Sequence, residues 1–222
     1  MVKAIYFIKR KPGMSLENFR HYWLNNHAEV VRKVAEIRKY VQSHTLDSGY
    51  STHEPAYDGI AELWYDNTDV MRQIVNTPES RAAGEDDANF IDMTKFGFIL
   101  VDERVQKEAP TTPEMPKLIA FLTRKAGMDV DKFQAYWRGH HGPVASKIPQ
   151  VRRYVQCHVR RSAYMSGRSP VYDGVAETWF ENLDAMRESG DTEEYRAVRA
   201  DEANFLEPGK IQFIIAREYP II

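Results

Sequence analysis

FRHYWLNNHAEVVRKVAEIRKYVQSH, residues 19–44, aligns without a gap on FQAYWRGHHGPVASKIPQVRRYVQCH, residues 133–158. The likeness continues downstream, where YDGIAELWYDN from Tyr57 matches YDGVAETWFEN from Tyr172, and DDANF at 86–90 matches DEANF at 201–205. Self-similarity over a domain-sized period indicates a duplicated unit. The sequence therefore predicts one repeat over residues 1–105, a proline-rich linker over 106–116 and a second repeat over 117–222.

Each repeat has the pattern strand, helix, strand, strand, helix, strand. In the first repeat, a β-rich run at 2–10 ends at a Pro-Gly turn, and Ser15 is a suitable cap for a helix that starts at residue 16. The predicted strands and helical segments that follow are 39–45, 58–65, 69–75, 78–91 and 96–105. The pattern predicts an α+β fold of tandem ferredoxin-like βαββαβ repeats. Helices cover only one face of each antiparallel sheet, so we expect the two sheets to pack face to face as an intrachain α/β barrel.

Composition excludes several classes of protein. The chain has 222 residues, of which 43% are hydrophobic and 28% charged, and its net charge is −2. These values are typical of a globular protein and offer no basic footprint for nucleic acid or for an anionic membrane. A single cysteine, Cys157, permits no intrachain disulfide, so a cytoplasmic location is expected. Cys157 aligns with Ser43 and shares a strand face with Val155, which predicts a small buried side chain and not a nucleophile.

Three repeated motifs resemble the EthD family: the Y-W-x3-H helix, the Y-V-Q-x-H strand and the D-G-x-A-E-x-W strand. The resemblance covers nearly all of both repeats and omits only the linker. It implies the dimeric α/β-barrel, ferredoxin-like superfamily, in which single-domain members pair sheet to sheet. Members are linked to the breakdown or cyclisation of small organic compounds. Relatives include muconolactone isomerases, polyketide cyclases or dehydratases, and cofactor-free monooxygenases.

Four histidines are the predicted catalytic residues. His27 and His141 occupy matching places on an aromatic helix face, and Gly142-Pro143 is expected to interrupt the second helix beside the imidazole. His44 and His158 lie on a strand face that also carries tyrosine and glutamine. If this face points into the space between the sheets, it lines a small-molecule pocket; if it faces the helices, its side chains are hydrogen-bonded core residues.

Glu62 and Glu177 also match between the repeats, each between apolar strand neighbours. A carboxylate close to a histidine suits general acid and base catalysis, whereas an ion pair with a strand lysine or arginine is the alternative. Asn89 and Asn204 are interpreted as helix-capping residues. The predicted substrate-binding residues are Tyr22, Trp23, Tyr40, Gln42, Trp64, Tyr136, Trp137, Tyr154, Gln156, Trp179 and Arg160.

The two repeats differ in charge. Residues 1–105 carry 13 basic and 16 acidic side chains, whereas residues 117–222 carry 16 and 14. Arginines gather around the second Y-V-Q-x-H strand, at positions 152, 153, 160, 161 and 168. The second site is therefore predicted to bind anions better, although solvated surface arginines are the alternative.

The sequence lacks a glycine-rich phosphate loop, a G-x-S-x-G elbow and a zinc-type histidine or cysteine motif. We therefore expect no metal and no cofactor. The predicted function is a cofactor-independent lyase or isomerase that uses histidine acid-base catalysis on an aromatic or polyketide-like substrate, in dehydration, cyclisation, lactone isomerisation or decarboxylation. The alternatives are a cofactor-free monooxygenase and a non-catalytic module that binds haem or a small molecule. The expected partners are a small-molecule substrate and a second copy of the fused chain. The arginines would suit a substrate that is anionic. Neither nucleic acid nor a membrane is an expected partner.

Overall fold

The structure is a computed structural model that describes residues 1–165 and 169–222. Arg168, one of the arginines discussed above, lies outside the described residues. The chain divides into two compact units. The first unit comprises Met1–Leu100 and Glu218–Ile222, and the second comprises Val101–Arg217.

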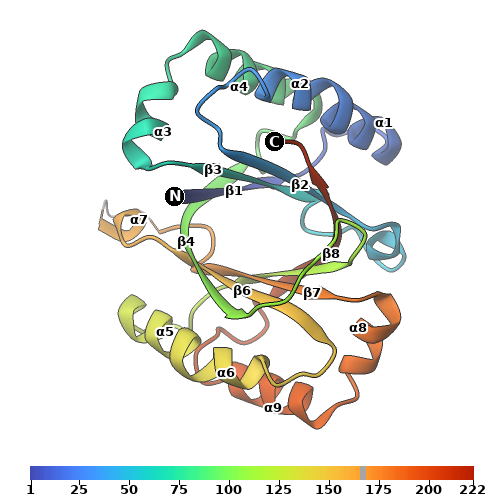
Figure 1. The fold of residues 1–222 in the computed structure, drawn as a ribbon, viewed down its shortest axis with the longest axis vertical. Helices are drawn as coiled ribbons and strands as arrows, with labels where there is room; N and C mark the ends of the chain where they lie inside the picture. The colour runs from blue at the N-terminus through green and yellow to red at the C-terminus, as the bar shows by residue number, and fades with distance from the viewer. Residues whose placement is uncertain (166–168) are drawn as a thin grey trace. The chain divides into compact units, whose positions relative to one another are not determined.

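The first unit has a sheet in which β1 (Val2–Ile8) and β2 (Lys39–Thr45) both pair antiparallel with β3 (Gly59–Tyr65). Its helical segments lie on one face of this sheet (Figure 1). These segments are α1 (Leu16–His21), η1 (Tyr22–His27), α2 (Ala28–Val31), α3 (Thr68–Ile74) and α4 (Pro78–Phe90). A short 3₁₀ segment, η2 (Asp47–Tyr50), follows β2.

The second unit repeats this arrangement. Its strand β7 (Gly174–Phe180) lies between β5 (Lys117–Leu122) and β6 (Val151–Val159), and both pairings are antiparallel. The helices again cover one face of the unit's own sheet (Figure 1). They are α5 (Val130–Tyr136), η3 (Trp137–His141), α6 (Gly142–Ala145), α8 (Leu183–Ser189) and α9 (Glu193–Glu202), with a short α7 (Ser162–Met165) after β6.

The last strand of each repeat runs on past its own unit. Strand β4 (Gly97–Lys107) pairs with β6 from Val101 onward, and β8 (Gln212–Pro220) pairs with β5 from Gln212 to Ala216. The hydrogen-bonded order β1-β3-β2-β8-β5-β7-β6-β4 closes on itself. The α+β class, the tandem ferredoxin-like repeats and the closed barrel predicted from the sequence are therefore confirmed. The repeat boundaries at 105 and 117 stay a sequence-based prediction, because the compact units divide inside β4 and β8.

Local sequence explains how the first helical run starts and continues. Ser15 caps α1 by accepting a hydrogen bond from the backbone N–H of Asn18. The run then passes through a π-helical segment, η1, that ends at His27, and the second repeat has the same π segment ending at His141. The expectation that Gly142-Pro143 interrupts the helix is wrong. Pro143 lies in the first turn of α6, where a missing N–H is tolerated, so the chain stays helical.

The D-G dipeptide at the start of β3 seats the tryptophan of the helix. A Cβ at Gly59 would lie 2.8 Å from the ring of Trp23, and a Cβ at Gly174 would lie 2.4 Å from the ring of Trp137. Only glycine leaves room for this close approach. The tryptophans are fully buried between sheet and helices, which fixes the position of the histidine one helical turn further along.

Candidate functional site

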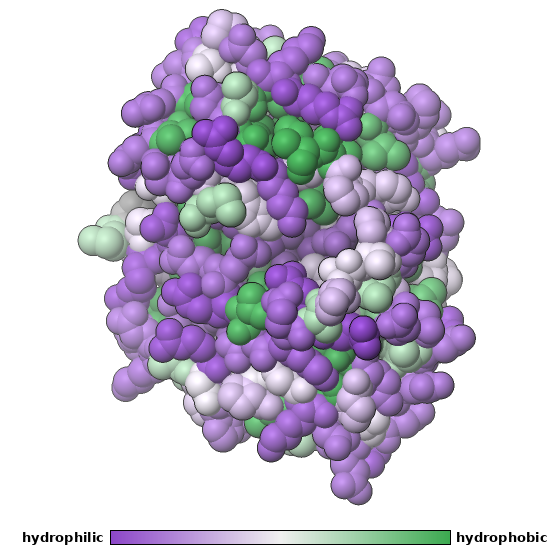
Figure 2. Space-filling model, in the orientation of Figure 1, coloured by the Kyte–Doolittle hydropathy of each residue, from purple (hydrophilic) through white to green (hydrophobic). Residues whose placement is uncertain are grey.

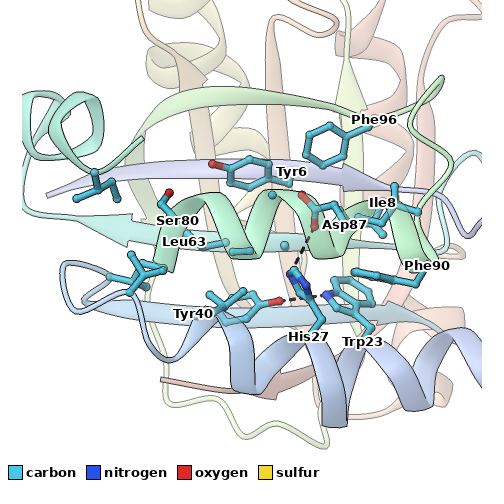
Figure 3. Close-up of a pocket in the computed structure, with 18 of the residues that line it drawn as sticks. Tyr6, Ile8, Trp23, His27, Tyr40, Leu63, Ser80, Asp87, Phe90 and Phe96 are labelled. Carbon is cyan, nitrogen blue, oxygen red and sulfur yellow. Dashed lines mark hydrogen bonds and ion pairs between the residues drawn. The ribbon is translucent and has the colours of Figure 1, made fainter. Parts of the chain in front are cut away.

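A cavity of about 240 Å³ lies inside the first unit, between its sheet and its helices. The polar groups that line it are those of Tyr6, His27, Tyr40, Tyr65, Ser80 and Asp87, and most of its other lining residues are apolar. Figure 3 shows Asp87 of α4 pointing toward His27 of η1, with Tyr6 on strand β1. In Figure 2 most of the visible surface is hydrophilic, and hydrophobic residues gather over the first unit in the band between its helices and its sheet. The cavity therefore has the make-up of a small-molecule site.

His27 is oriented by two carboxylates. Its Nδ1 lies 2.8 Å from Asp86 Oδ2, and its Nε2 lies 3.5 Å from Asp87 Oδ1. Burial lowers the pKa of His27, and the hydrogen bond with Asp86 only partly offsets this effect. The imidazole is therefore neutral near pH 7, with its proton on Nδ1 toward Asp86. Its Nε2 is then free to accept a proton from a molecule in the cavity.

Asp86 is held in place by groups behind the cavity. The hydroxyl of Tyr22 donates to Asp86 at 2.6 Å, and the amide of Asn89 donates to it at 2.9 Å. Burial alone would raise the pKa of Asp86, but the hydrogen bonds from Tyr22, His27 and Asn89 lower it below its usual value. Asp86 stays ionised and fixes the orientation of the imidazole. Asn89 therefore acts on the side chain of Asp86, and the helix-capping role that the sequence predicts for it stays a prediction.

Asp87 is the carboxyl group that lines the cavity. Burial, and then the charge of neighbouring Asp86, raises the pKa of Asp87 to about 7. Its side chain is 18% exposed. The cavity thus contains a neutral imidazole and a carboxyl group that is half protonated at neutral pH, which is the pairing that general acid-base catalysis requires.

The second unit has a corresponding cavity of about 370 Å³. His141 Nδ1 lies 2.8 Å from Asp201 Oδ2, and the hydroxyl of Tyr136 donates to Asp201 at 2.6 Å. Asn204 donates to the same carboxylate at 3.1 Å. Burial also lowers the pKa of His141. The histidine, aspartate, tyrosine and asparagine are therefore arranged alike in both repeats.

The two cavities differ in their second acid. Glu202 replaces Asp87, and Arg199 replaces Gly84. Arg199 Nη1 lies 2.5 Å from Glu202 Oε2. Burial raises the pKa of Glu202, but the charge of Arg199 opposes the rise. The first cavity therefore offers the better proton donor, and the second is larger.

The Tyr-Gln-His face of each strand faces the helices, so the second of the two orientations considered for it is the observed one. Tyr40 accepts a hydrogen bond from the indole of Trp23 at 3.0 Å, and Gln42 donates to the backbone carbonyl of Trp23 at 2.8 Å. The ring of His44 stacks on Trp23 with centroids 4.3 Å apart. The side chains of Tyr40, Gln42 and His44 are hydrogen-bonded core groups, and only Tyr40 of the three lines the cavity.

The second repeat has the same contacts. Tyr154 accepts from the indole of Trp137, Gln156 donates to the carbonyl of Trp137, and His158 packs on the indole ring. Tyr154 lines the second cavity, as do Trp137 and His141. Catalytic roles for His44 and His158 stay predictions.

Glu62 and Glu177 lie apart from the histidines. Glu62 pairs in register with Ile5 and Val41, which places it on the sheet face opposite Tyr40 and Gln42. It forms an ion pair of 2.7 Å with Lys3, and Glu177 lies 3.6 Å from Lys117. The alternative of an ion pair with a strand lysine is therefore the one observed.

The tryptophans next to these glutamates lie with lysine over their rings. Lys3 and Lys39 lie over Trp64, at 4.8 and 4.5 Å from the ring centroid. Lys117 lies 4.7 Å from the ring centroid of Trp179. Neither tryptophan is among the residues that line the two cavities, and substrate binding by Trp64 and Trp179 stays a prediction.

Cys157 is buried, as the sequence predicts. Within the described ranges, Glu103, Cys157 and Glu177 each place one ligand atom within 4.8 Å of the others, so the three could hold a metal ion. The ammonium group of Lys117 lies beside Glu177 and supplies positive charge to the same place, which disfavours a cation there.

The model of the EthD domain matches the sequence twice, over residues 11–94 and 125–209. The chain belongs to the EthD family. None of the curated proteins compared with the sequence matches it.

Solved structures with the same fold include an anthrone oxidase-like protein, at 8% identity and a TM-score of 0.67, which covers 99% of this chain and 92% of its own. A candidate monooxygenase from Lactobacillus acidophilus has 11% identity and a TM-score of 0.58, and the match covers 100% of this chain and 94% of the monooxygenase chain. An EthD family protein from Bacillus halodurans has 26% identity and a TM-score of 0.39, and it covers 47% of this chain and 99% of its own. Among the described residues, no helix has the length and apolar character needed to span a membrane.

Proposed function

We propose that the chain is a cofactor-independent enzyme that moves protons on a small, largely apolar molecule, with His27 and its counterpart His141 as general bases. The reactions proposed are lyase or isomerase steps beside a carbonyl: dehydration, cyclisation, lactone isomerisation or decarboxylation of an aromatic or polyketide-like substrate. The observation that supports this most directly is the contact set of His27. Asp86 accepts a hydrogen bond from Nδ1–H at 2.8 Å, and the other ring nitrogen, Nε2, then has its lone pair available to a molecule in the cavity of about 240 Å³.

Asp87 makes the first cavity the better acid-base site. With a pKa raised to about 7 by burial and by Asp86, its carboxyl group can donate a proton to the substrate after His27 has removed one. Removal and return of a proton at different atoms is the chemistry of an isomerase, and return to a leaving hydroxyl is the chemistry of a dehydratase. The second cavity contains the same base but holds its acid, Glu202, against Arg199.

Cofactor-free oxygenation is the second candidate function. The fold is shared with an anthrone oxidase-like protein at a TM-score of 0.67, and a similarity at this low identity concerns the fold alone. The apolar walls of the cavities would suit an anthrone or phenol, whose deprotonation by the same histidines would leave an electron-rich carbanion that dioxygen can oxidise. A module that binds haem or a small molecule without turnover stays the third alternative, and the visible absorption of the purified protein tests its haem form.

The experiment is a proton-exchange assay, because exchange reports the proposed base whatever the later steps are. The full chain is incubated in D₂O with a panel of lactones and an anthrone, with and without dioxygen, and loss of the acidic C–H signal is followed by NMR. We expect the double variant His27→Ala/His141→Ala to lower the rate of exchange by about 10²- to 10⁴-fold, and each single variant to remove the share of the rate that its own cavity contributes. His21→Ala, an exposed position on the same helix run, is the matched control and should leave the rate unchanged.

The products separate the candidate functions. An isomerised or dehydrated product that forms without oxygen supports the lyase or isomerase, and an oxidised product that forms only with oxygen supports the oxygenase. Equal exchange by wild type and the double variant would refute the proposed base.

A further inference from the structure

A third cavity, of about 220 Å³, lies in the second unit and is distinct from the cavity of His141. Its lining includes four arginines and two aspartates, which come from β4, α5, η3 and the end of β6. Two of the arginines have partners: Arg160 Nε lies 3.5 Å from Asp102 Oδ1, and Arg161 Nη2 lies 3.0 Å from Asp131 Oδ2. The lining side chains still carry a net charge of +2.

The excess charge belongs to Arg104 and Arg138. Arg104 donates only to the adjacent backbone carbonyl of Glu103, at 2.9 Å, and neither guanidinium is within ion-pair distance of a described carboxylate. Both are close enough to His158 to lower its pKa, although burial is the larger cause. Two guanidinium groups without carboxylate partners at one cavity are the usual arrangement for binding an oxyanion.

His158 adds a hydrogen-bond acceptor to this cavity. The amide nitrogen of Gln156 donates to the carbonyl of Trp137 and to the hydroxyl of Tyr154, at 2.8 and 3.1 Å. The amide oxygen of Gln156 therefore faces His158 Nε2, at 3.0 Å, and accepts a hydrogen bond from the N–H of that nitrogen. His158 is 6% exposed and lines the cavity. Its remaining nitrogen, Nδ1, carries a lone pair and can accept a hydrogen bond from a ligand.

The first repeat lacks this set of charges. In the repeat alignment Tyr219 replaces Arg104, and Leu24 replaces Arg138. Tyr219 packs on the ring of His44, with centroids 4.7 Å apart, where the second repeat has a guanidinium beside His158. Arg160 likewise corresponds to Leu46. The arginines are therefore not needed to build the fold, because the same fold forms without them.

We propose that this third cavity is a binding site for a small oxyanion, a phosphate or a carboxylate, that also carries a hydroxyl group. Arg104 and Arg138 bind the negative charge, and His158 Nδ1 accepts a hydrogen bond from the hydroxyl. The cavity has space for a ligand of a few non-hydrogen atoms.

The test is calorimetric titration of the full chain at low ionic strength with inorganic phosphate, lactate and acetate. We expect phosphate, which has a protonated oxygen, and lactate, which has a hydroxyl, to bind at least about tenfold more tightly than acetate, which has no such donor. Replacement of either arginine by the residue of the first repeat, Arg104→Tyr or Arg138→Leu, should weaken binding by about 10- to 100-fold, the effect of losing a hydrogen bond to a charged group. Arg152→Leu is the matched control, because Arg152 pairs with Glu181 at 3.3 Å and does not line the cavity.

NMR distinguishes this site from other anion-binding places. Long-range ¹H–¹⁵N spectra should show His158 with its proton on Nε2, and its Nδ1 resonance should move during titration with lactate. Binding of none of the three anions, or binding that Arg104→Tyr and Arg138→Leu leave unchanged, would overturn the site. Acetate binding as tight as that of lactate would overturn the role of His158.

Discussion

Replacing Asp87 with asparagine should make the protein more stable at high pH and should remove a distinctive pH dependence. Burial and the charge of Asp86 raise the pKa of Asp87 to about 7 in the folded chain, whereas an unfolded aspartate titrates near 3.9. The folded state therefore binds more protons than the unfolded state between these two values. A raised folded pKa means that the stabilisation is complete below the unfolded pKa and is lost as the pH rises through 7.

The magnitude follows from these two pKa values. Between pH 8 and pH 5, protonation of Asp87 should stabilise the wild type by about 3 kcal/mol, and an asparagine, which does not titrate, provides none of this. The histidines other than His27, which lies 3.5 Å from Asp87, titrate alike in both proteins, so their contributions cancel when the two curves are subtracted. We therefore expect the difference in unfolding free energy, variant minus wild type, to grow by about 3 kcal/mol from pH 5 to pH 8.

The assay is urea unfolding followed by tryptophan fluorescence, at several pH values, with the midpoint and slope reported for each. Glu202→Gln is the matched control in the second repeat. Burial raises the pKa of Glu202 too, but Arg199 opposes it, so its effect should have the same sign and a smaller size. Parallel curves for Asp87→Asn and wild type would refute the raised pKa and, with it, Asp87 as the proton donor.

Three further predictions concern the other histidines, the tyrosine behind the site and the assembly of the repeats. Burial is the main cause that lowers the pKa of His44 and of His158 to about 3. Stability that depends on a lowered histidine pKa is lost as the pH falls below the unfolded value near 6.5, so each of the two histidines should lower the unfolding free energy by about 1.4 kcal/mol at pH 5.5. Urea unfolding in the Asp87→Asn background measures this loss. Tyr22→Phe removes a hydrogen bond of 2.6 Å to the carboxylate that orients His27; we expect turnover to fall about tenfold and the acid limb of the pH–rate profile to move upward, and an unchanged profile would contradict the positioning role. The fragment 1–105 lacks the C-terminal residues that pair with its sheet, so it should dimerise or aggregate in sedimentation experiments, whereas a stable monomer would count against face-to-face packing of the repeats.

Most of the fold could be predicted because the two repeats show the same signals twice. The strand predicted at 39–45 is the strand observed, Lys39–Thr45, and the helix predicted over 78–91 ends one residue earlier, at Phe90. Alternation along a strand shows which side chains share a face but does not show which face meets the helices. For this reason the sequence places Tyr40, Gln42 and His44 on one strand face, but it does not show whether that face meets the helices or the space between the sheets.

The sequence does not identify the acid partners of His27 and His141, for a related reason. The repeated D-[DE]-A-N-F motif was visible in the sequence, but Asp86 lies 59 residues from His27 along the chain. Helical periodicity within α4 cannot show which residue of another helix it meets. The strand pattern indicates Glu62 either as an acid beside a histidine or as half of an ion pair, because it lies between apolar neighbours, and the structure shows the ion pair, with Lys3. A repeated aspartate three residues before a repeated asparagine is the signal in the sequence that points to Asp86 and Asp201.

The path of β8 has a consequence for the order in which the protein can be completed during synthesis. The backbone N–H of Ile221 donates to the carbonyl of Tyr40 at 2.8 Å, and Glu218–Ile222 belong to the first unit although they are the last residues of the chain described. A ribosome makes residues 218–222 after residues 1–217, so the first repeat emerges before the second and yet gains its last strand partner only when the second repeat is complete. Until then the edge of β2 has open hydrogen-bonding groups. The first repeat therefore completes its sheet only after the second repeat has been made, and loss of residues 218–222 would damage the repeat that was made earlier of the two.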